Sequence, residues 1–565
     1  MRTFRSALLG AALLGMLACN NFLQVDYQNN PDRNKLLGTA NDVENFIGSA
    51  YSTAHAGTIG GATVGAGGGN DALQPQLFTM GLENVSSLAN FAMGPRGAIP
   101  RNQIDNARGS QGNLGNYRDY SVEHRAARIA TIGLHALQTV TLGSPGRNDR
   151  ARAFALFVQG VAEGNLALAY DSAAILTEND GPQDIIPLSG YSQVMTAALG
   201  LLDSSIAIVT ADPAGFPLPT TWINTNAATG PTAAQFTQLA RSYKALFRAN
   251  VARTPAERAA EDWTAVLADA SAGITADLTI YMQPPPAGAW DVNWVIQAYA
   301  TGAANWHQMS QFILGMADTS GGFDAWLATP RNSRVPFLVV TPDLRLPQGT
   351  TRAVQTGDTL RTGFRTFTGL PYIRNRPVGE DQPGDPFGIS MYDFFRSRAF
   401  FSATRIGNYP VMTAAQIRLL AAEAQIRLGN VAAAATLIDV SRVGKGGLPS
   451  LATAGIADTL TAVPGGQGCV PRVPNSATSF TSTTCGTIWD ALKWEYRIET
   501  AYTGYGNWYF ASRGWGDLPQ GTALQWPVPY QEMDARGEPF YGLGGVGLPG
   551  GAAAGNYGLF AGGVY

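Results

Sequence analysis

Histidine and cysteine, which supply many catalytic and metal-binding side chains, are scarce in this sequence. Its 565 residues include only four histidines and three cysteines. The histidines occur in no His-Glu-x-x-His motif or other metal-ligand spacing, and His124 and His135 are expected to be structural residues within a helix. The sequence also has no Gly-x-Ser-x-Gly nucleophile motif and no phosphate-binding loop. We therefore predict no catalytic residues, no metal site and no cofactor.

Charged residues are also few, and neither sign dominates. They make up 14% of the chain, and 38 Lys and Arg residues against 41 Asp and Glu residues leave a formal net charge of −3. Because nucleic-acid binding needs clustered basic side chains, this balance argues against a nucleic-acid partner. Long apolar runs are missing after residue 18, so we expect no membrane-spanning helix in the rest of the chain.

The N-terminal residues have the pattern of a bacterial lipoprotein signal. Arg2 and Arg5 precede Ala7–Ala18, an uncharged run that is shorter than the roughly 20 residues a membrane helix needs. Cys19 follows and would be the site of acylation. We predict a signal peptide over 1–18, an acylated Cys19 that anchors the chain in lipid, and a tether over 19–38. The alternative is an ordinary secretory signal with a chance cysteine.

The other two cysteines, Cys469 and Cys485, flank a loop rich in Pro, Ser and Thr. Outside the cytoplasm such a pair is expected to form a disulfide bond. Closing a loop of this length stabilises a fold by roughly 3 kcal/mol in the chain-entropy model. Zinc binding is the alternative, although the sequence has no Cys-x-x-Cys motif and no histidine near this loop.

Apolar periodicity predicts a mainly α fold with one body over 39–565. Residues 39–274 are predicted to be helical, and 411–565 to form a helical repeat followed by a C-terminal segment. Many inner positions are Ala or Gly, which lets paired helices approach closely, as stacked helix-turn-helix repeats require. Between them, 275–410 is rich in Pro, Gly, Trp and Tyr and is predicted to be a loop-rich, irregular insertion. The predicted long helices are Tyr117–Leu142, Asp149–Leu176, Ser192–Val209, Phe236–Val251, Pro255–Gly273, Thr413–Leu428, Val431–Arg442 and Thr487–Tyr502.

Several segments spread over the chain carry related motifs. The most specific is Leu419–Gly429, which follows the pattern L-L-x-A-E-A-x-x-R-L-G. The other matching segments are Cys19–Val25, Gly48–Tyr51, Arg150–Tyr170, Trp494–Glu499, Trp508–Gly516 and Trp526–Met533. In these motifs the chain resembles the SusD/RagB family of outer-membrane nutrient-binding lipoproteins. It departs from the family at Tyr509–Ala511, where an acidic residue is missing, and at Asn20-Asn21, where the acidic run that often directs such proteins to the cell surface is missing.

The resemblance implies a SusD-like fold, with tetratricopeptide-like helix pairs and a loop-rich ligand region, and a function without catalysis. Members of this family act as lids on a TonB-dependent, SusC-like outer-membrane transporter, and they capture oligosaccharides or, in some branches, peptides. We therefore expect this protein to be a lipid-anchored outer-membrane protein, at the cell surface if the anchor lies in the outer leaflet. The alternatives are a peptide-binding lid, a surface glycoside hydrolase, and a helical-repeat adaptor without a small ligand.

Aromatic side chains in the irregular region are the first candidate ligand contacts. Trp290, Trp294, Tyr299 and Trp306 lie there, interleaved with Asn and Gln residues. An aromatic face packs against the apolar face of a sugar ring while neighbouring amides hydrogen bond to its hydroxyl groups. The alternative for each residue is a place in the core.

The loop Asn84–Asn116, with Asn84 and Phe91, is the second candidate, because the corresponding part of the family often lines the ligand site. Its alternative is a solvated loop without a ligand.

Two groups of carboxylates keep the hydrolase alternative open. Glu495 and Glu499 lie four residues apart on one helix face, and we expect a structural role for them, with Arg497 as the neighbouring cation. The acidic residues Glu257, Glu261 and Asp262 open a predicted helix and complement its dipole. A hydrolase would instead need two carboxylates roughly 5–10 Å apart in a cleft.

Overall fold

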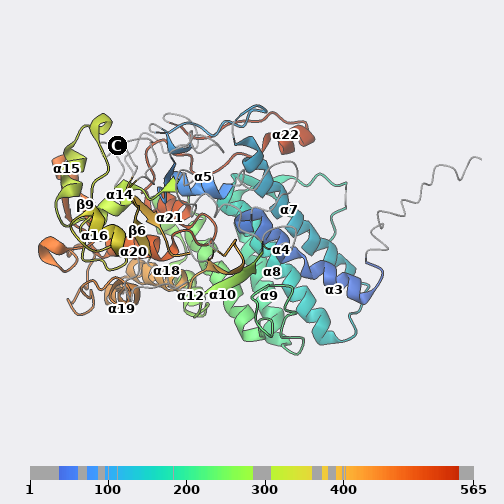
Figure 1. Cartoon of the computed structure of the whole chain (residues 1–565). Coiled ribbons are helices and arrows are strands. Elements are labelled where there is room, and N and C mark those ends of the chain that lie inside the picture. Colours follow the sequence, from blue (N-terminus) through green and yellow to red (C-terminus); the bar gives the residue numbers. More distant parts are fainter. Residues whose placement is uncertain are drawn as a thin grey trace, which may run out of the picture.

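The structure consists mainly of α-helices joined by loops and short strands (Figure 1). It is a computed structural model that describes residues 37–60, 73–86, 96–98, 101–110, 112–181, 183–283, 290, 307–358, 372–378, 390–397, 400 and 403–545. The predicted site residues Cys19, Phe91, Trp294, Tyr299 and Trp306 lie outside this part of the chain. The mainly α fold predicted from the sequence is confirmed.

The first half of the chain forms packed helices, and those over residues 40–55, 113–169 and 191–211 lie at one end of the molecule (Figure 1). Helix starts follow the capping residues of the sequence: Ser144 caps α8, and Thr232 forms a capping box with Gln235 at α10. The elements are α3 (Ala40–Gly48), α4 (Ala50–His55), the π-helix η1 (Ala56–Gly60), α5 (Leu73–Met80), α7 (Asn113–Ala136), α8 (Pro145–Ala169), α9 (Tyr191–Ala211), α10 (Ala233–Asn250), α11 (Pro255–Ala260) and α12 (Trp263–Ser271).

Small residues allow the closest helix contacts, as the Ala- and Gly-rich pattern predicted. At Gly160 of α8, a Cβ atom would lie 2.9 Å from the backbone oxygen of Ala198 in α9. At Gly164, a Cβ atom would overlap the ring of Phe247 in α10. Because neither position has room for a methyl group, glycine sets how closely α8 approaches its two neighbours.

Helix α9 is apolar enough to revise one expectation. By length and composition alone, its 21 residues could cross a membrane. This finding contradicts our prediction that the chain after residue 18 has no such helix. Val194, Ala198 and Leu202 on one face are buried, and α9 packs along α8. We therefore interpret α9 as a helix of the protein core.

Several predicted helix boundaries are wrong, and two of them have a clear local reason. Pro255–Gly273 is not one helix, because the Asp262 side chain accepts a hydrogen bond of 2.9 Å from the Ala265 backbone N–H and starts α12 anew. The helix predicted to reach Leu176 ends at Ala169. Strand β2 (Ser172–Ala174) then pairs antiparallel with β3 (Leu188–Gly190).

The irregular region begins and ends in one strand pair. Strand β4 (Leu278–Met282) pairs antiparallel with β8 (Gly407–Met412), so the chain leaves and re-enters the helical body at the same place. Between them lie β5 (His307–Gln308), α14 (Gln311–Leu314), the 3-10 helix η4 (Gly315–Ala317), α15 (Gly322–Ala328), the 3-10 helix η5 (Arg331–Ser333), α16 (Arg352–Gly357), β6 (Ile373–Asn375) and β7 (Tyr392–Phe394).

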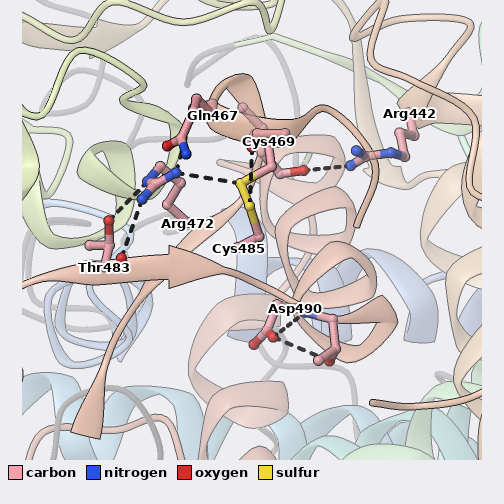
Figure 2. The surroundings of a disulfide bond; sticks show 10 residues. Arg442, Gln467, Cys469, Arg472, Thr483, Cys485 and Asp490 are labelled. Carbon is pink, nitrogen blue, oxygen red and sulfur yellow. Dashed lines mark hydrogen bonds between the residues drawn. A yellow bond between two sulfur atoms is a disulfide. The ribbon is translucent and has the colours of Figure 1, made fainter. Parts of the chain in front are cut away.

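The C-terminal part returns to helices and contains the disulfide bond. Cys469 and Cys485 are joined, with 5.8 Å between their Cα atoms (Figure 2). Across this loop, the Arg472 side chain donates a hydrogen bond to the Thr483 hydroxyl group. Arg442 donates to the backbone oxygen of Val470 at 2.8 Å. The elements are α18 (Ala414–Arg427), α19 (Val431–Arg442), the 3-10 helices η6 (Gly466–Gly468) and η7 (Ser476–Thr478), β9 (Arg472–Pro474), β10 (Thr483–Cys485), α20 (Ile488–Thr500), α21 (Asn507–Trp515) and α22 (Tyr530–Arg536).

One buried carboxylate connects several of these helices. Glu423 of α18 accepts two hydrogen bonds, of 2.8 and 2.7 Å, from Arg258 of α11. It also accepts from Arg427 at 3.0 Å and from Trp515 of α21 at 3.1 Å. Burial alone would raise the pKa of Glu423, but the charge and hydrogen bonds of Arg258, with those of Arg427 and Trp515, outweigh it and lower the pKa to about 2.

This shift predicts how stability changes in acid. The Glu423 carboxyl has a pKa of about 2 in the folded chain against an ordinary value of 4.5, so it stabilises the fold above pH 4.5 and loses that effect as the pH falls to 2. Between pH 5 and 2 we expect the wild type to lose on the order of 3 kcal/mol more unfolding free energy than Glu423→Gln. Urea denaturation across this range measures the difference, and parallel pH curves would contradict the assignment.

Candidate functional site

The two segments that the sequence nominated as the ligand region meet in the structure. Strand β1 (Val85–Ser86) pairs antiparallel with β5, with Val85 opposite Gln308 and Ser86 opposite His307. Asn84, which begins the predicted ligand loop, directly precedes β1. Trp306, the last aromatic residue of the predicted cluster, directly precedes β5. The pairing therefore brings the ends of both candidate segments to one place.

A second strand pair supports this meeting point. The Met309 backbone N–H, directly after β5, donates to the backbone oxygen of Tyr392 in β7 at 2.9 Å. Strand β7 in turn pairs antiparallel with β6. We call β1, β5, β6 and β7 the junction strands. Strands β5, β6 and β7 of the irregular region are thus connected, through β1, to the loop that begins at Asn84.

Glu83 and Tyr502 lie next to the junction strands, and the sequence did not predict a role for either residue. Tyr502 has a φ of 52°, a backbone conformation rare for a large side chain, and its N–H donates to the buried Glu83 carboxylate. The Tyr502 ring lies 5.1 Å from that of Phe78 and 5.5 Å from that of Phe394 in β7. Glu83 belongs to no periodic pattern or motif in the sequence, so its bond to Tyr502 could be found only in the structure.

Two of the predicted ligand contacts are structural residues here. Trp290 is 9% exposed, and its ring lies 5.1 Å from His55 and 6.1 Å from Tyr51. Asn84 is completely buried and accepts a hydrogen bond of 3.2 Å from the Thr79 hydroxyl group. Because Asn84 is completely buried and Trp290 almost so, Trp290 has the surroundings of a core residue, and Asn84 supports the start of its loop rather than facing a ligand.

The Glu495 and Glu499 carboxylates have structural roles, but with a different cation from the one predicted. Arg345, from the irregular region, donates to Glu495 at 2.7 and 2.8 Å and to Glu499 at 3.2 Å. Asp343 accepts from the same guanidinium group at 2.7 Å. Arg497, the predicted partner, instead pairs with Asp517 at 2.7 Å. This Arg345 cluster (Arg345, Asp343, Glu495 and Glu499) is buried and connects the irregular region to α20.

The acidic residues near α11 are also largely engaged. Glu257 accepts from the Tyr191 hydroxyl group at 3.1 Å and from the Arg253 N–H at 2.7 Å, and Asp262 caps α12. Glu261 lines a cavity of about 510 Å³, and burial raises its pKa to about 7. Among the described residues, it is the only one of these three whose carboxylate accepts no hydrogen bond. A hydrolase needs two cooperating carboxyl groups.

His124 is a satisfied structural histidine, as expected. Its Nδ1 atom lies 2.9 Å from the Tyr120 backbone oxygen, and its Nε2 atom accepts from the Ala174 N–H at 3.3 Å. Burial lowers its pKa and favours the neutral ring. Across the part of the chain that the structure describes, no group of three or more His, Cys, Asp or Glu residues could hold a metal ion.

The Arg345 cluster predicts a stability effect that a catalytic carboxylate would not show. Glu495→Ala removes two hydrogen bonds to a fully buried guanidinium group, so we expect a loss of about 3–5 kcal/mol of unfolding free energy. Glu538→Ala, at an exposed position, is the matched control and should change it by less than about 0.5 kcal/mol. Equal effects of the two substitutions in urea denaturation would contradict this role for Glu495.

Comparison with known proteins gives a likeness of fold. No family model and no curated protein sequence matches the chain. A SusD-like protein from Bacteroides fragilis superposes with a TM-score of 0.52 at 14% identity, covering 86% of this chain and 87% of that one. A SusD homolog from Parabacteroides distasonis gives 0.52 at 13% identity, covering 85% of each chain. A SusD superfamily protein from the same species gives 0.52 at 10% identity, covering 88% of this chain and 97% of that one. The resemblance read from the motifs is thus confirmed in three dimensions: this chain has the SusD fold.

Proposed function

We propose that this protein captures an oligosaccharide released from a polymeric nutrient and passes it, without catalysis, to a TonB-dependent outer-membrane transporter. The observation that carries the proposal is the pairing of β1 with β5, which joins the two candidate ligand segments on a SusD fold. Loops held by a rigid helical scaffold are a common place for binding sites.

The proposed contacts are the aromatic residues that flank the junction strands. Phe91 follows β1 by a few positions, while Trp294, Tyr299 and Trp306 precede β5. Amphipathic rings suit a saccharide, because each sugar ring has an apolar face that can pack on an aromatic side chain and hydroxyl groups that need polar partners. Trp290 and Asn84 would act indirectly, by holding the ends of these segments.

The anchor and the partner follow from the sequence motifs. Cys19, once acylated, would hold the chain in the outer membrane, and the segment over 19–38 would serve as its tether. The helical pairs would provide the extended surface that contacts a SusC-like transporter. Cell-surface exposure is part of this proposal, although Asn20-Asn21 lacks the usual acidic signal.

Engaged carboxylates favour capture over hydrolysis. Glu495 and Glu499 are bound to Arg345, and Glu257 and Asp262 are used in local hydrogen bonds. These are four of the five acidic residues that kept the hydrolase alternative open. The fifth, Glu261, lines its cavity beside Asp262, whose carboxylate is already used as the cap of α12. A peptide-binding lid is the nearest alternative, since it would use the same scaffold and anchor.

A glycan-array screen followed by calorimetric titration of the mature chain, residues 19–565, tests the proposal. We expect binding of at least one oligosaccharide class, with Trp294→Ala and Trp306→Ala each weakening it about tenfold if the removed ring is a main contact. Phe540→Ala is the aromatic control, because Phe540 is 38% exposed and lies beside Tyr530 of α22.

Two outcomes would overturn the proposed function, and a third would overturn the proposed location of the site. Binding of peptides but no saccharide would favour the peptide-binding lid. Release of reducing ends from a bound oligosaccharide would favour a hydrolase. Binding that is unchanged in both tryptophan variants would move the ligand site away from the junction strands.

A further inference from the structure

A polar pocket lies between residues of the irregular region and the C-terminal helices. Its cavity is about 250 Å³. Ala414, Ala415 and Arg418 line it from α18, and Val440 and Ser441 line it from α19. Its charged and phenolic lining residues are Asp277, Tyr372, Arg396, Arg418, Lys445 and Glu499.

Both acidic residues of this pocket are already engaged. Glu499 accepts from Arg345 at 3.2 Å and from the Tyr372 hydroxyl group at 3.0 Å. Asp277 accepts from the Ala414 N–H at 2.8 Å, at the start of α18. Both carboxylates thus have hydrogen-bond donors of their own, and Glu499 also has the positive charge of Arg345 beside it.

Two of the three cations have no such partner. Arg418 uses its Nε atom to donate to the Leu437 backbone oxygen at 3.2 Å. Neither Arg418 nor Lys445 forms an ion pair with any residue that the structure describes, whereas Arg396 lies 4.0 Å from Glu499. The two guanidinium Nη atoms of Arg418 and the exposed ammonium group of Lys445 thus remain as hydrogen-bond donors toward one small cavity.

The surroundings of Arg418 favour an anion. Burial lowers its pKa, and the nearby charges of Glu499, Glu495 and Asp277 only partly offset that cost. Ala414 and Ala415 bring the first turn of the 14-residue helix α18 to the cavity wall. Asp277 already accepts from the Ala414 N–H and Thr413 from the Gln416 N–H, so the donors for an anion come from the cationic side chains. Guanidinium groups bind carboxylates and sulfates through paired hydrogen bonds.

We propose that this pocket binds the anionic substituent of an acidic saccharide, a carboxylate or a sulfate ester. This inference rests on the proposed function and narrows its substrate class to glycans that carry negative charge. Arg418 is the main contact, and Lys445 adds a second positive charge at the open edge. The cavity admits one charged group with part of its sugar ring rather than a whole oligosaccharide.

Calorimetric titration of the mature chain with glucuronate, glucose 6-sulfate, inorganic sulfate and glucose, at constant ionic strength, tests this pocket. We expect the two acidic sugars to bind more tightly than glucose. Lys445→Met should weaken them several-fold and Arg418→Met about tenfold or more, while Arg418→Lys retains part of the affinity. Arg125→Met, which removes an exposed cation from α7, should leave all four titrations unchanged.

The controls separate this inference from the proposed function. Lys445 is exposed, so its variant is expected to fold even if Arg418→Met does not. Equal binding of glucuronate and glucose, or unchanged acidic-sugar binding in Lys445→Met, would overturn the pocket assignment and leave neutral-saccharide capture standing. Acidic-sugar and sulfate binding that is lost in Lys445→Met would support the pocket even if the glycan screen finds no oligosaccharide and the proposed function fails.

Discussion

The pairing of Glu423 with Arg258 is the constraint on which the helical body depends. Arg258 is completely buried, and its guanidinium group also donates to the Ala249 backbone and, at 3.0 Å, to the Asn250 side chain at the end of α10. Through Glu423 and Trp515, one pair of charges therefore fixes the relative positions of α10, α11, α18 and α21. Removing one member would leave an uncompensated buried charge, so these helices are held in one arrangement.

The irregular region is attached to this body at separate places, each of a different kind. The β4–β8 pair closes its two ends, the Arg345 cluster connects its middle to α20, and the junction strands connect it to the loop after Asn84. A region so attached can present irregular segments at fixed positions without long strands or helices of its own. This is the arrangement that a binding site on a helical scaffold requires.

The sequence was informative where structure is local and periodic. Helix positions followed from apolar spacing, and the family motif around Glu423 identified the fold. Partners remote in sequence could not be predicted: Arg258 for Glu423 and Arg345 for Glu495 carry no local signal. Strands of two residues have no periodicity, so the β1–β5 pairing was invisible. Trp290 shows the remaining ambiguity, because an aromatic residue among amides suits a core and a sugar site equally well.

The central claim is that saccharide capture takes place at the segments joined by β1 and β5. A crystal structure of the mature chain with the oligosaccharide selected by the glycan screen tests it most directly. The account predicts sugar rings packed on aromatic residues within 87–95 or 291–306, next to the junction strands. A saccharide bound only against the helices α3 to α10, with no contact from either segment, would contradict it.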